Sequence, residues 1–432
     1  MSKAIISNKI YMTVDHSYFK YLEKELTYTI PSYSSVDKFQ TIKNLKVVNY
    51  NISGGMMLVA FPVGRTDLIP SNYEIVDKRS INTLEDFPEF KMTLRLSQQE
   101  IYDNVEDNCV INAKVGFGKT LSALAIASKL KQKTLVVTHT VALRSQWEAE
   151  VVKALGVKPG VIGSSKFNIN SPVVVANTQS LVKVIPRIAR EFGLLVVDEV
   201  HRVPSTTFSK IVDGSFAKYK IGLSGTLERK DQKHVVILDY FGRTVFRPDK
   251  ENTMTPSVDV IHTGLQFPSS GPWADRVSGL LDSSIYRKLV TALADDYSRR
   301  GHSVVVVADR VEFLKYGHEN SQYPSELLIG GTEDRQRIID NIYSGKSKQL
   351  WGSQNIVSEG LSINPLSCLI LATPMNNMPL LEQLIGRVIR EHPDKPAPVI
   401  VDLRLEGYTT NSQFNNRLGH YMKEGYSVSH IK

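Results

Sequence analysis

The stretch Ala113-Lys114-Val115-Gly116-Phe117-Gly118-Lys119-Thr120 contains residue types that could bind the phosphates of a nucleotide. Gly116 and Gly118 allow the backbone to turn tightly and to direct its N–H groups toward phosphate oxygens. The ammonium group of Lys119 would reach the β- and γ-phosphates, and the hydroxyl of Thr120 would bind Mg²⁺. The spacing therefore predicts a site for ATP and Mg²⁺.

The segments on either side of this stretch predict how it is positioned. The apolar run 109–111 precedes it and indicates a strand, and the apolar-periodic run 121–130 follows it and indicates a helix. This arrangement would place the positive end of the helix beside the phosphates. Ala113 stands where the usual pattern has glycine, and a glycine-rich turn before a helix is the plain alternative.

A pair of acidic residues follows a second apolar strand. The run 194–197 is followed by Asp198-Glu199-Val200-His201. Adjacent carboxylates at the end of a buried strand are costly unless they meet a cation. We expect Asp198 to hold Mg²⁺ through its shell of waters and Glu199 to orient and deprotonate the attacking water. The alternative is an acidic helix N-cap.

Further strand ends carry small polar residues. Ser224 and Thr226 follow the strand-like run 221–223, and their hydroxyls could hydrogen-bond the acidic motif and link hydrolysis to movement. On its own this is ordinary turn chemistry. Two other strands end in residues suited to successive phosphates of a nucleic acid strand, namely Thr140, Arg144, Thr178 and Gln179. Trp147 nearby is expected to be a core residue rather than a stacking platform.

The C-terminal half contains a candidate pair of arginine fingers. The run 382–390 is predicted to be helical, so Arg387 and Arg390, three residues apart, should share one face. Two guanidinium groups over a γ-phosphate would stabilise the charge of phosphoryl transfer. The alternative is a solvated basic face. A loop expected to respond to both nucleotide and nucleic acid contains Ser353, Glu359 and Gly360.

The alternation of strand-like and helix-like runs predicts an α/β fold with two parallel sheets, each covered by helices on both faces. One set of runs lies in 93–250 and a second in 251–432, with the linker expected at 248–256. Residues 1–92 are rich in tyrosine and predict a small α+β accessory domain, with a helix over 15–26 and a hairpin around 54–55. The sequence Glu89-Phe90-Lys91 matches part of some nuclease sites, but no clear upstream Pro-Asp accompanies it.

Composition limits the function classes. The chain has 432 residues, 42% hydrophobic and 22% charged, without an apolar run long enough to cross a membrane or a signal-peptide core. Its two cysteines, Cys109 and Cys368, are far apart and indicate buried, reduced thiols in a cytoplasmic protein. The net charge is +8, divided as +1 in 1–92, +9 in 93–250 and −2 in 251–432. A basic ATPase segment suits a phosphate backbone.

Taken together and in this order, these motifs resemble those of superfamily 2 helicases of the DEAH/DEVH type. Within that family the chain resembles the phage branch-migration helicases of the UvsW kind, including the helicases of T5-type phages. The resemblance implies two RecA-like lobes with ATP between them and a nucleic acid strand across both. It implies that Gln98 recognises adenine, and that nucleotide and nucleic acid are coupled through His201 and Gln383. His139 replaces the usual proline of a strand-contact motif, and Ser362 stands where the family often has aspartate.

The expected function is an ATP- and Mg²⁺-dependent DNA helicase or translocase acting on forked or branched DNA in recombination, repair or replication restart. A monomer is expected, without membrane association, in the host cytoplasm if a phage encodes the protein. Three alternatives stay open: a duplex translocase that does not separate strands, an RNA helicase, and a scaffold that binds nucleic acid without hydrolysis. Lys119, Asp198, Glu199, Arg387 and Arg390 argue against the scaffold, because a protein without ATPase activity does not need all five.

Overall fold

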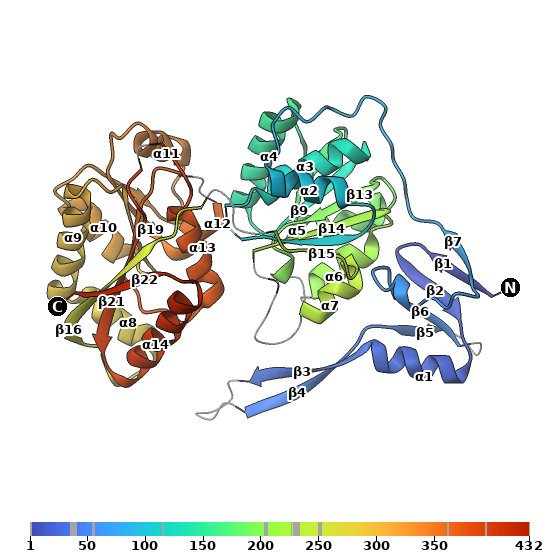
Figure 1. The fold of residues 1–432 in the computed structure, drawn as a ribbon, viewed down its shortest axis with the longest axis horizontal. Helices are drawn as coiled ribbons and strands as arrows, with labels where there is room; N and C mark the ends of the chain where they lie inside the picture. The colour runs from blue at the N-terminus through green and yellow to red at the C-terminus, as the bar shows by residue number, and fades with distance from the viewer. Residues whose placement is uncertain are drawn as a thin grey trace. The chain divides into compact units, whose positions relative to one another are not determined.

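The computed structural model describes residues 2–34, 41–53, 57–114, 116–202, 206–225, 227, 234–248, 253–360, 363–393 and 395–431. The chain divides into two compact units, one made of residues 1–114 and 118–249 and the other of 115–117 and 250–432. Each unit is built around a mostly parallel sheet (Figure 1). The predicted α/β class is therefore confirmed, while the domain boundaries at 92 and 250 stay predictions.

The N-terminal part of the first unit is a five-stranded sheet in the order β5-β6-β2-β1-β7, packed on helix α1. Its strands are β1 (Lys3–Ile6), β2 (Lys9–Thr13), β5 (Asn51–Ser53), β6 (Leu58–Pro62) and β7 (Glu74–Asp77). Helix α1 (His16–Glu25) begins where a carboxylate oxygen of Asp15 accepts the backbone N–H of Tyr18 at 2.8 Å. Strands β3 (Thr27–Ser34) and β4 (Thr41–Val48) form a separate two-stranded sheet that projects from this part (Figure 1).

The hairpin predicted around residues 54–55 differs in one respect. Strands β5 and β6 do pair antiparallel on either side of that position. Val47 and Val48, however, belong to β4, whose eight residues all pair with β3. Val47 and Val48 therefore pair with β3, which lies about twenty residues earlier in the chain. The strand that pairs with β6 is instead β5, residues 51–53.

The larger part of the first unit contains an eight-stranded sheet in the order β11-β10-β12-β9-β13-β14-β8-β15. All its pairs are parallel except β10 with β11. The strands are β8 (Cys109–Asn112), β9 (Thr134–Thr138), β10 (Gly160–Gly163), β11 (Lys166–Phe167), β12 (Val173–Asn177), β13 (Leu194–Val197), β14 (Tyr219–Ser224) and β15 (Val245–Phe246).

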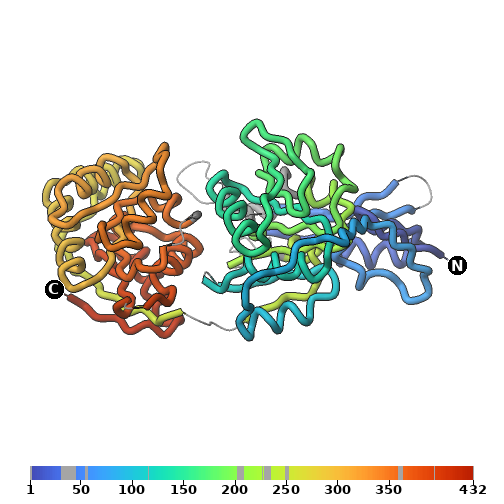
Figure 2. Tube along the Cα trace, turned by 90° about the horizontal axis from the view of Figure 1, so that it is seen from above, coloured from blue at the N-terminus to red at the C-terminus, as the bar shows by residue number. Residues whose placement is uncertain are grey.

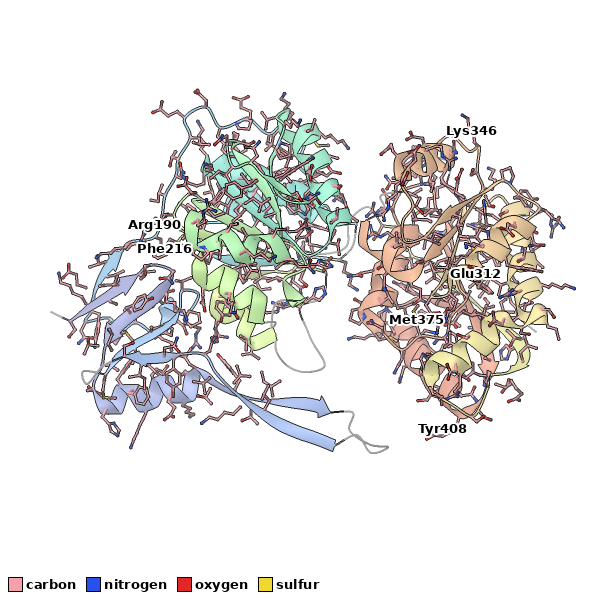
Figure 3. All side chains as sticks on the ribbon, turned by 180° about the vertical axis from the view of Figure 1, so that it is seen from behind. Arg190, Phe216, Glu312, Lys346, Met375 and Tyr408 are labelled. Atoms are coloured by element: carbon pink, nitrogen blue, oxygen red, sulfur yellow. The ribbon has the colours of Figure 1, made fainter. Side chains whose placement is uncertain are left out.

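The central strands of this sheet are buried along their whole length, because helices cover both of its faces. One core cluster joins alternate strand residues such as Leu135 and Val137 to the helices α5, α6 and α7. Arg190, two residues beyond α5, lies over the ring of Phe216 with 3.8 Å between its guanidinium carbon and the ring centroid (Figure 3). The helices are α2 (Leu96–Asn104), α3 (Lys119–Leu130), α4 (Val141–Leu155), α5 (Thr178–Ile188), α6 (Thr206–Gly214) and α7 (His234–Phe241).

The second unit contains a seven-stranded, wholly parallel sheet in the order β18-β19-β17-β20-β21-β16-β22. Its strands are β16 (Ser257–Gln266), β17 (Val304–Ala308), β18 (Ser325–Leu328), β19 (Gln349–Ser353), β20 (Cys368–Leu371), β21 (Val399–Glu406) and β22 (Ser427–Ile431). Its helices are α8 (Trp273–Asp282), α9 (Ser284–Arg299), α10 (Val311–Asn320), α11 (Arg335–Tyr343), α12 (Gln354–Gly360), α13 (Met378–Val388) and α14 (Tyr408–Lys423).

Strand β17 shows why helices pack on both sides of this sheet. Its five residues are all fully buried, and successive side chains point to opposite faces. Val304 and Val306 join a cluster with α8, α9 and α10, whereas Val305 and Val307 join one with α11, α12, α13 and α14. The sequence Val-Val-Val-Val-Ala thus supplies two cores at once. Cys109 and Cys368 are buried free thiols, as predicted.

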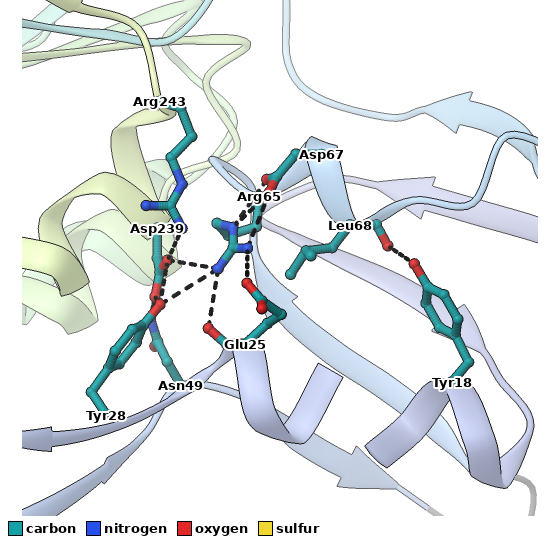
Figure 4. Close-up of polar contacts among 9 residues, drawn as sticks. All are labelled: Tyr18, Glu25, Tyr28, Asn49, Arg65, Asp67, Leu68, Asp239 and Arg243. Carbon is teal, nitrogen blue, oxygen red and sulfur yellow. Dashed lines mark hydrogen bonds and ion pairs between the residues drawn. The ribbon is translucent and has the colours of Figure 1, made fainter. Parts of the chain in front are cut away.

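The N-terminal part is joined to the larger part of the first unit by a buried carboxylate, Asp239 of α7 (Figure 4). The hydroxyl of Tyr28 lies 2.9 Å from both carboxylate oxygens, Nδ2 of Asn49 donates at 2.7 Å, and Nη1 of Arg65 lies 3.3 Å away. Asp239 and Arg65 are 0% and 1% exposed. Burial raises the pKa of Asp239, and the donors from Asn49 and Tyr28 oppose that rise.

Other contacts extend this junction, and the N-terminal residues lie beside the larger part in both views (Figures 1 and 2). The backbone N–H of Gly64 donates to the carbonyl of Asp239 at 2.8 Å. A Cβ atom at Gly64 would lie 2.4 Å from the backbone nitrogen of Gly242, so this approach requires glycine. Lys9 pairs with Asp213 at 3.1 Å. These contacts hold the two parts together as one packed body.

We predict that Asp239→Ala lowers the free energy of unfolding by on the order of 3 kcal/mol, because the buried guanidinium of Arg65 loses an acidic partner. Urea denaturation would measure the loss. Arg243→Ala is the matched control, since Arg243 is 44% exposed and lies 3.9 Å from the same carboxylate, and it should cost less than about 1 kcal/mol. Equal losses in both variants would contradict the assignment of Asp239 as the centre of this junction.

Candidate nucleotide and nucleic-acid site

Three neighbouring parallel strands, β13, β14 and β8, bring the predicted chemistry to one edge of the eight-stranded sheet. The candidate phosphate-binding stretch, residues 113–120, follows β8, the acidic pair of Asp198 and Glu199 follows β13, and Ser224 ends β14 between them. The backbone N–H of Ala113 donates to the carbonyl of Ser224 at 3.0 Å, which ties the start of the loop to the central strand. Ligands of open α/β sheets bind at this carboxyl edge.

The phosphate-binding stretch has the backbone that its glycines predict. Gly116 and Gly118 have φ angles of +91° and +87°. A Cβ atom at Gly118 would lie 2.6 Å from Nε2 of Gln98, so a side chain there would be strained as well as crowded. Helix α3 begins directly after Gly118, and Nζ of Lys119 donates to the carbonyl of Ala113 at 2.6 Å. The lysine is thus held at the loop rather than extended into solvent.

The remaining residues of this stretch are placed as follows. Thr120 lies in the first turn of α3 and is partly buried, Phe117 is buried, and Lys114 is exposed. Val115 lies outside the described residues. Gln98, in the first turn of α2, is 2% exposed, and its Oε1 accepts the backbone N–H of Arg95 at 3.0 Å. Its amide nitrogen is therefore the end that faces Gly118.

Asp198 receives hydrogen bonds on both carboxylate oxygens. The indole N–H of Trp147 donates to Oδ2 at 2.8 Å, and the backbone N–H of Glu199 donates to Oδ1 at 2.9 Å. Burial and the neighbouring charge of Glu199 raise the pKa of Asp198, while Trp147 and the charge of Lys119 oppose the rise. Sequence reasoning placed Trp147 in the core, and it is 1% exposed. The sequence does not predict its contact with Asp198, because only the fold brings α4 to the end of β13.

Glu199 has a φ of +53°, a left-handed backbone conformation that is uncommon for residues other than glycine. Such conformations cluster at functional sites, where the surrounding structure imposes them. Nδ1 of His201 lies 3.1 Å from Oε2 of Glu199 and 3.1 Å from Oγ of Ser224. His201 and Ser224 therefore link the ends of β13 and β14, as the sequence suggested. Thr226 lies outside the described residues.

The residues at this edge suit a Mg²⁺ ion bound together with nucleotide phosphates. Mg²⁺ is usually held by one or two carboxylates, waters and substrate phosphates rather than by a full protein cage. The described part of the chain contains no group of three or more His, Cys, Asp or Glu residues that could hold a metal ion by itself. Asp198 and Thr120 offer the carboxylate and hydroxyl oxygens that such a shared site needs. A cation would also offset the cost of two adjacent, partly buried carboxylates.

The candidate nucleic-acid contacts of the first unit lie at the same edge, after β9 and β12. Thr140 caps α4, where its Oγ1 accepts the backbone N–H of Leu143 at 3.2 Å. The hydroxyl of Thr178 donates to the carbonyl of Thr138 at 2.8 Å, and Gln179 is exposed. Ser353 ends β19 in the second unit and is partly buried.

Arg144, the fourth candidate of the first unit, is less accessible than the others. It is 6% exposed, and its Nη1 donates to Oδ1 of Asn177 at 2.7 Å and to Oγ of Ser164 at 3.1 Å. Its Nε donates to Oε1 of Glu148 at 2.9 Å. The guanidinium thus forms hydrogen bonds inside the unit, and its role as a nucleic-acid contact stays a prediction. From sequence, its position one helical turn before Glu148 was the available signal.

The two candidate arginine fingers of the second unit are anchored near α12. Arg387, in α13, is buried and donates to the carbonyl of Ser358. Nη1 of Arg390 lies 3.5 Å from Oδ1 of Asn364. Gln383 lies on the same helix as Arg387 and is partly buried. The side-chain surroundings of Glu359 and Gly360, at the end of α12, lie outside the described part of the chain.

The predicted helix over 382–390 is too long. Helix α13 ends at Val388, and Arg390 forms a backbone bridge with Thr253 instead. The backbone N–H of Met254 donates to the carbonyl of Ile389 at 2.8 Å. Pairing with the incoming chain replaces the last helical turn, so the expectation that Arg387 and Arg390 share a helical face is wrong.

Within the described ranges, every helix is too short or too polar to span a bilayer.

Comparisons with known proteins agree with this architecture. A family model described as the res subunit of type III restriction enzymes matches residues 91–229, and one described as the helicase conserved C-terminal domain matches 285–392. A probable helicase of Escherichia phage T5 is 39% identical, over 99% of this chain and 95% of the relative. The ATP-dependent DNA helicase uvsW of Enterobacteria phage T4 is 22% identical, over 74% of this chain and 70% of the relative.

Among solved structures, S. cerevisiae Dbp5 bound to RNA and ADP BeF3 has a TM-score of 0.57 at 14% sequence identity. That likeness covers 79% of this chain and 90% of the other. At this level of identity the match shows the fold alone. It confirms the two RecA-like lobes expected from the sequence.

We predict that Lys119→Ala weakens nucleotide binding, because a positive charge is lost beside the β- and γ-phosphates. Glu199→Gln should still bind ATP but hydrolyse it at least about a hundredfold more slowly, the usual scale for a positioned base. Equilibrium binding of a fluorescent ATP analogue and steady-state ATPase rates separate the two effects. Lys129→Ala, at an exposed position in the last turn of the same helix, is the control. Near-normal turnover in Glu199→Gln would refute its role as the base.

Arg387→Ala and Arg390→Ala should leave nucleotide binding to the first unit largely intact while lowering kcat by on the order of a thousandfold, the scale of a lost arginine finger. Arg299→Ala, at a side chain that is 71% exposed, should leave kcat unchanged. If either variant lost ATP binding but kept kcat at saturating ATP, that arginine would not be a finger.

Proposed function

Because the chain belongs to the superfamily 2 helicases, we propose that it is an ATP-dependent DNA helicase or translocase that acts on forked or branched DNA. The family supports ATP use and a nucleic acid partner. The observation that carries the ATPase part is the meeting of the phosphate-binding stretch, the acidic pair and Ser224 at one edge of the eight-stranded sheet. This edge gathers a helix N-terminus, an ammonium group and two carboxylates, which together suit a nucleotide with its Mg²⁺.

We assign the following roles at this edge. Lys119 and the N-terminus of α3 bind the β- and γ-phosphates, and Gly116 and Gly118 allow the backbone to approach them. Thr120 and Asp198 hold Mg²⁺, which neutralises charge on the phosphates when bound. Glu199 orients the attacking water and takes its proton. Gln98 recognises the adenine through its amide.

The coupling between hydrolysis and movement is assigned to side chains that link strand ends or lobes. His201 and Ser224 join the acidic motif to β14, and their contact supports this role. Gln383, Arg387 and Arg390 belong to the second unit and would sense the γ-phosphate when the lobes close. Thr140, Thr178, Gln179 and Ser353 would hold successive phosphates of the nucleic acid strand.

Two observations favour DNA and a branched substrate. The relative from phage T4 is named as a DNA helicase. The N-terminal part is nearly neutral and is fixed to the basic motor segment through Asp239. A rigid, weakly charged attachment is better suited to bracing a duplex arm than to general electrostatic binding.

The experiment that tests this proposal compares ATPase rates with single-stranded DNA, plain duplex, forks, four-way junctions and single-stranded RNA under the same salt. The proposal expects the largest stimulation by forks or junctions. Stronger stimulation by RNA would assign the chain to RNA helicases. A labelled-strand unwinding assay separates a helicase from a duplex translocase, because only the helicase releases the labelled strand.

We predict that a chain beginning at Thr93 keeps ATPase activity stimulated by single strands but loses its preference for forked or branched DNA. The motor motifs are complete without residues 1–92. Truncation also removes Tyr28, Asn49 and Arg65 from Asp239, so a thermal melt must first establish that the shortened chain is folded. An unchanged fork-to-linear ratio in a folded truncation would rule out recognition by this part.

A point variant tests the same idea without exposing the junction. Tyr21, on α1, is 45% exposed and offers a ring that could stack on an unpaired base. Tyr21→Ala should lower the fork-to-linear ratio while leaving the melting temperature nearly unchanged. Tyr408→Ala is the control, because Tyr408 is 94% exposed on the second unit (Figure 3).

A further inference from the structure

The segment that carries Arg390 is held by a lysine that lies outside every motif considered above. Nζ of Lys395 donates to the carbonyl of Arg390 at 2.6 Å and to the carbonyl of Asn364 at 3.0 Å. Arg390 follows α13, and Asn364 lies in the loop that follows α12. One ammonium group therefore joins the arginine segment to the loop that follows α12.

Burying the ammonium group of a lysine costs free energy unless its N–H groups donate hydrogen bonds. Burial and the neighbouring charge of Arg390 lower the pKa of Lys395 to about 8. Two carbonyl acceptors offset part of that cost. Because both acceptors are backbone atoms, the contact fixes the chain position of Arg390, from which its guanidinium must reach any phosphate.

The segment that contains Ile389 and Arg390 also contacts other parts of the second unit. The linker end contacts it through the bridge between Thr253 and Arg390 and through the bond from Met254 to Ile389. The side chain of Asn364 accepts from Arg390, so both the backbone and the side chain of Asn364 are engaged. Lys395, which follows Arg390 in the chain, adds two hydrogen bonds to these contacts.

We propose that Lys395 is a positioning residue for Arg390, holding it against the loop after α12 so that it can act in phosphoryl transfer. The inference rests on the proposed role of Arg390 as an arginine finger. Lys395 acts through Arg390 and has no contact with nucleotide in this scheme. Its loss should therefore change kcat rather than ATP affinity.

The test uses Lys395→Met in the full chain, because methionine keeps most of the apolar stem and removes the donors. We expect kcat to fall roughly tenfold to a hundredfold, the scale for a displaced catalytic group, with a much smaller change in KM for ATP. Lys346→Met is the matched control, because Lys346 is exposed in the same unit (Figure 3). It should keep wild-type kcat.

A double variant distinguishes positioning from an independent effect. If Lys395 acts through Arg390, adding Lys395→Met to Arg390→Ala should lower kcat no further. Multiplicative losses would overturn the inference while leaving the finger role of Arg390 intact. Wild-type kcat in Arg390→Ala would overturn both. Wild-type kcat in Lys395→Met, or a variant that fails to fold in a thermal melt, would overturn the inference alone.

Discussion

The candidate site of the first unit depends on the placement of two adjacent carboxylates, Asp198 and Glu199, at the partly buried end of β13. Water no longer solvates them fully, so burial raises the pKa of Asp198 and the structure must supply compensating donors. Two donors, the indole N–H of Trp147 on α4 and the backbone N–H of Glu199, bind the carboxylate of Asp198, and the positive charge of Lys119 on α3 also opposes the rise. The parallel order of β9, β13, β14 and β8 is what brings these elements together.

A second buried carboxylate, that of Asp239, joins the N-terminal part to the larger part of the first unit. Asp239 draws donors from β3, from the residue after β4 and from the loop after β6, all in the N-terminal part. Because each donor is tied to the same buried oxygens, the N-terminal part is expected to move with the motor segment as one body. A substrate contacted by the N-terminal part would then be carried at a fixed distance from the nucleotide site.

In the second unit, backbone carbonyls contribute to the positions of the two candidate arginines. Arg387 donates to a carbonyl of α12, and the segment of Arg390 is fixed through Lys395 and the linker end. Backbone acceptors hold a guanidinium or its chain in place without neutralising its charge.

The sequence by itself determined the α/β class, the strand ends that carry the motifs and the meeting of the candidate site residues at one carboxyl edge. These follow from local properties: apolar runs, glycine at positions of positive φ, and the fixed direction of parallel strands. Three features required the tertiary structure: the bond from Trp147 to Asp198, the internal use of Arg144, and the early end of α13. Each depends on a partner distant in the chain, and local spacing contains no record of which distant groups become neighbours.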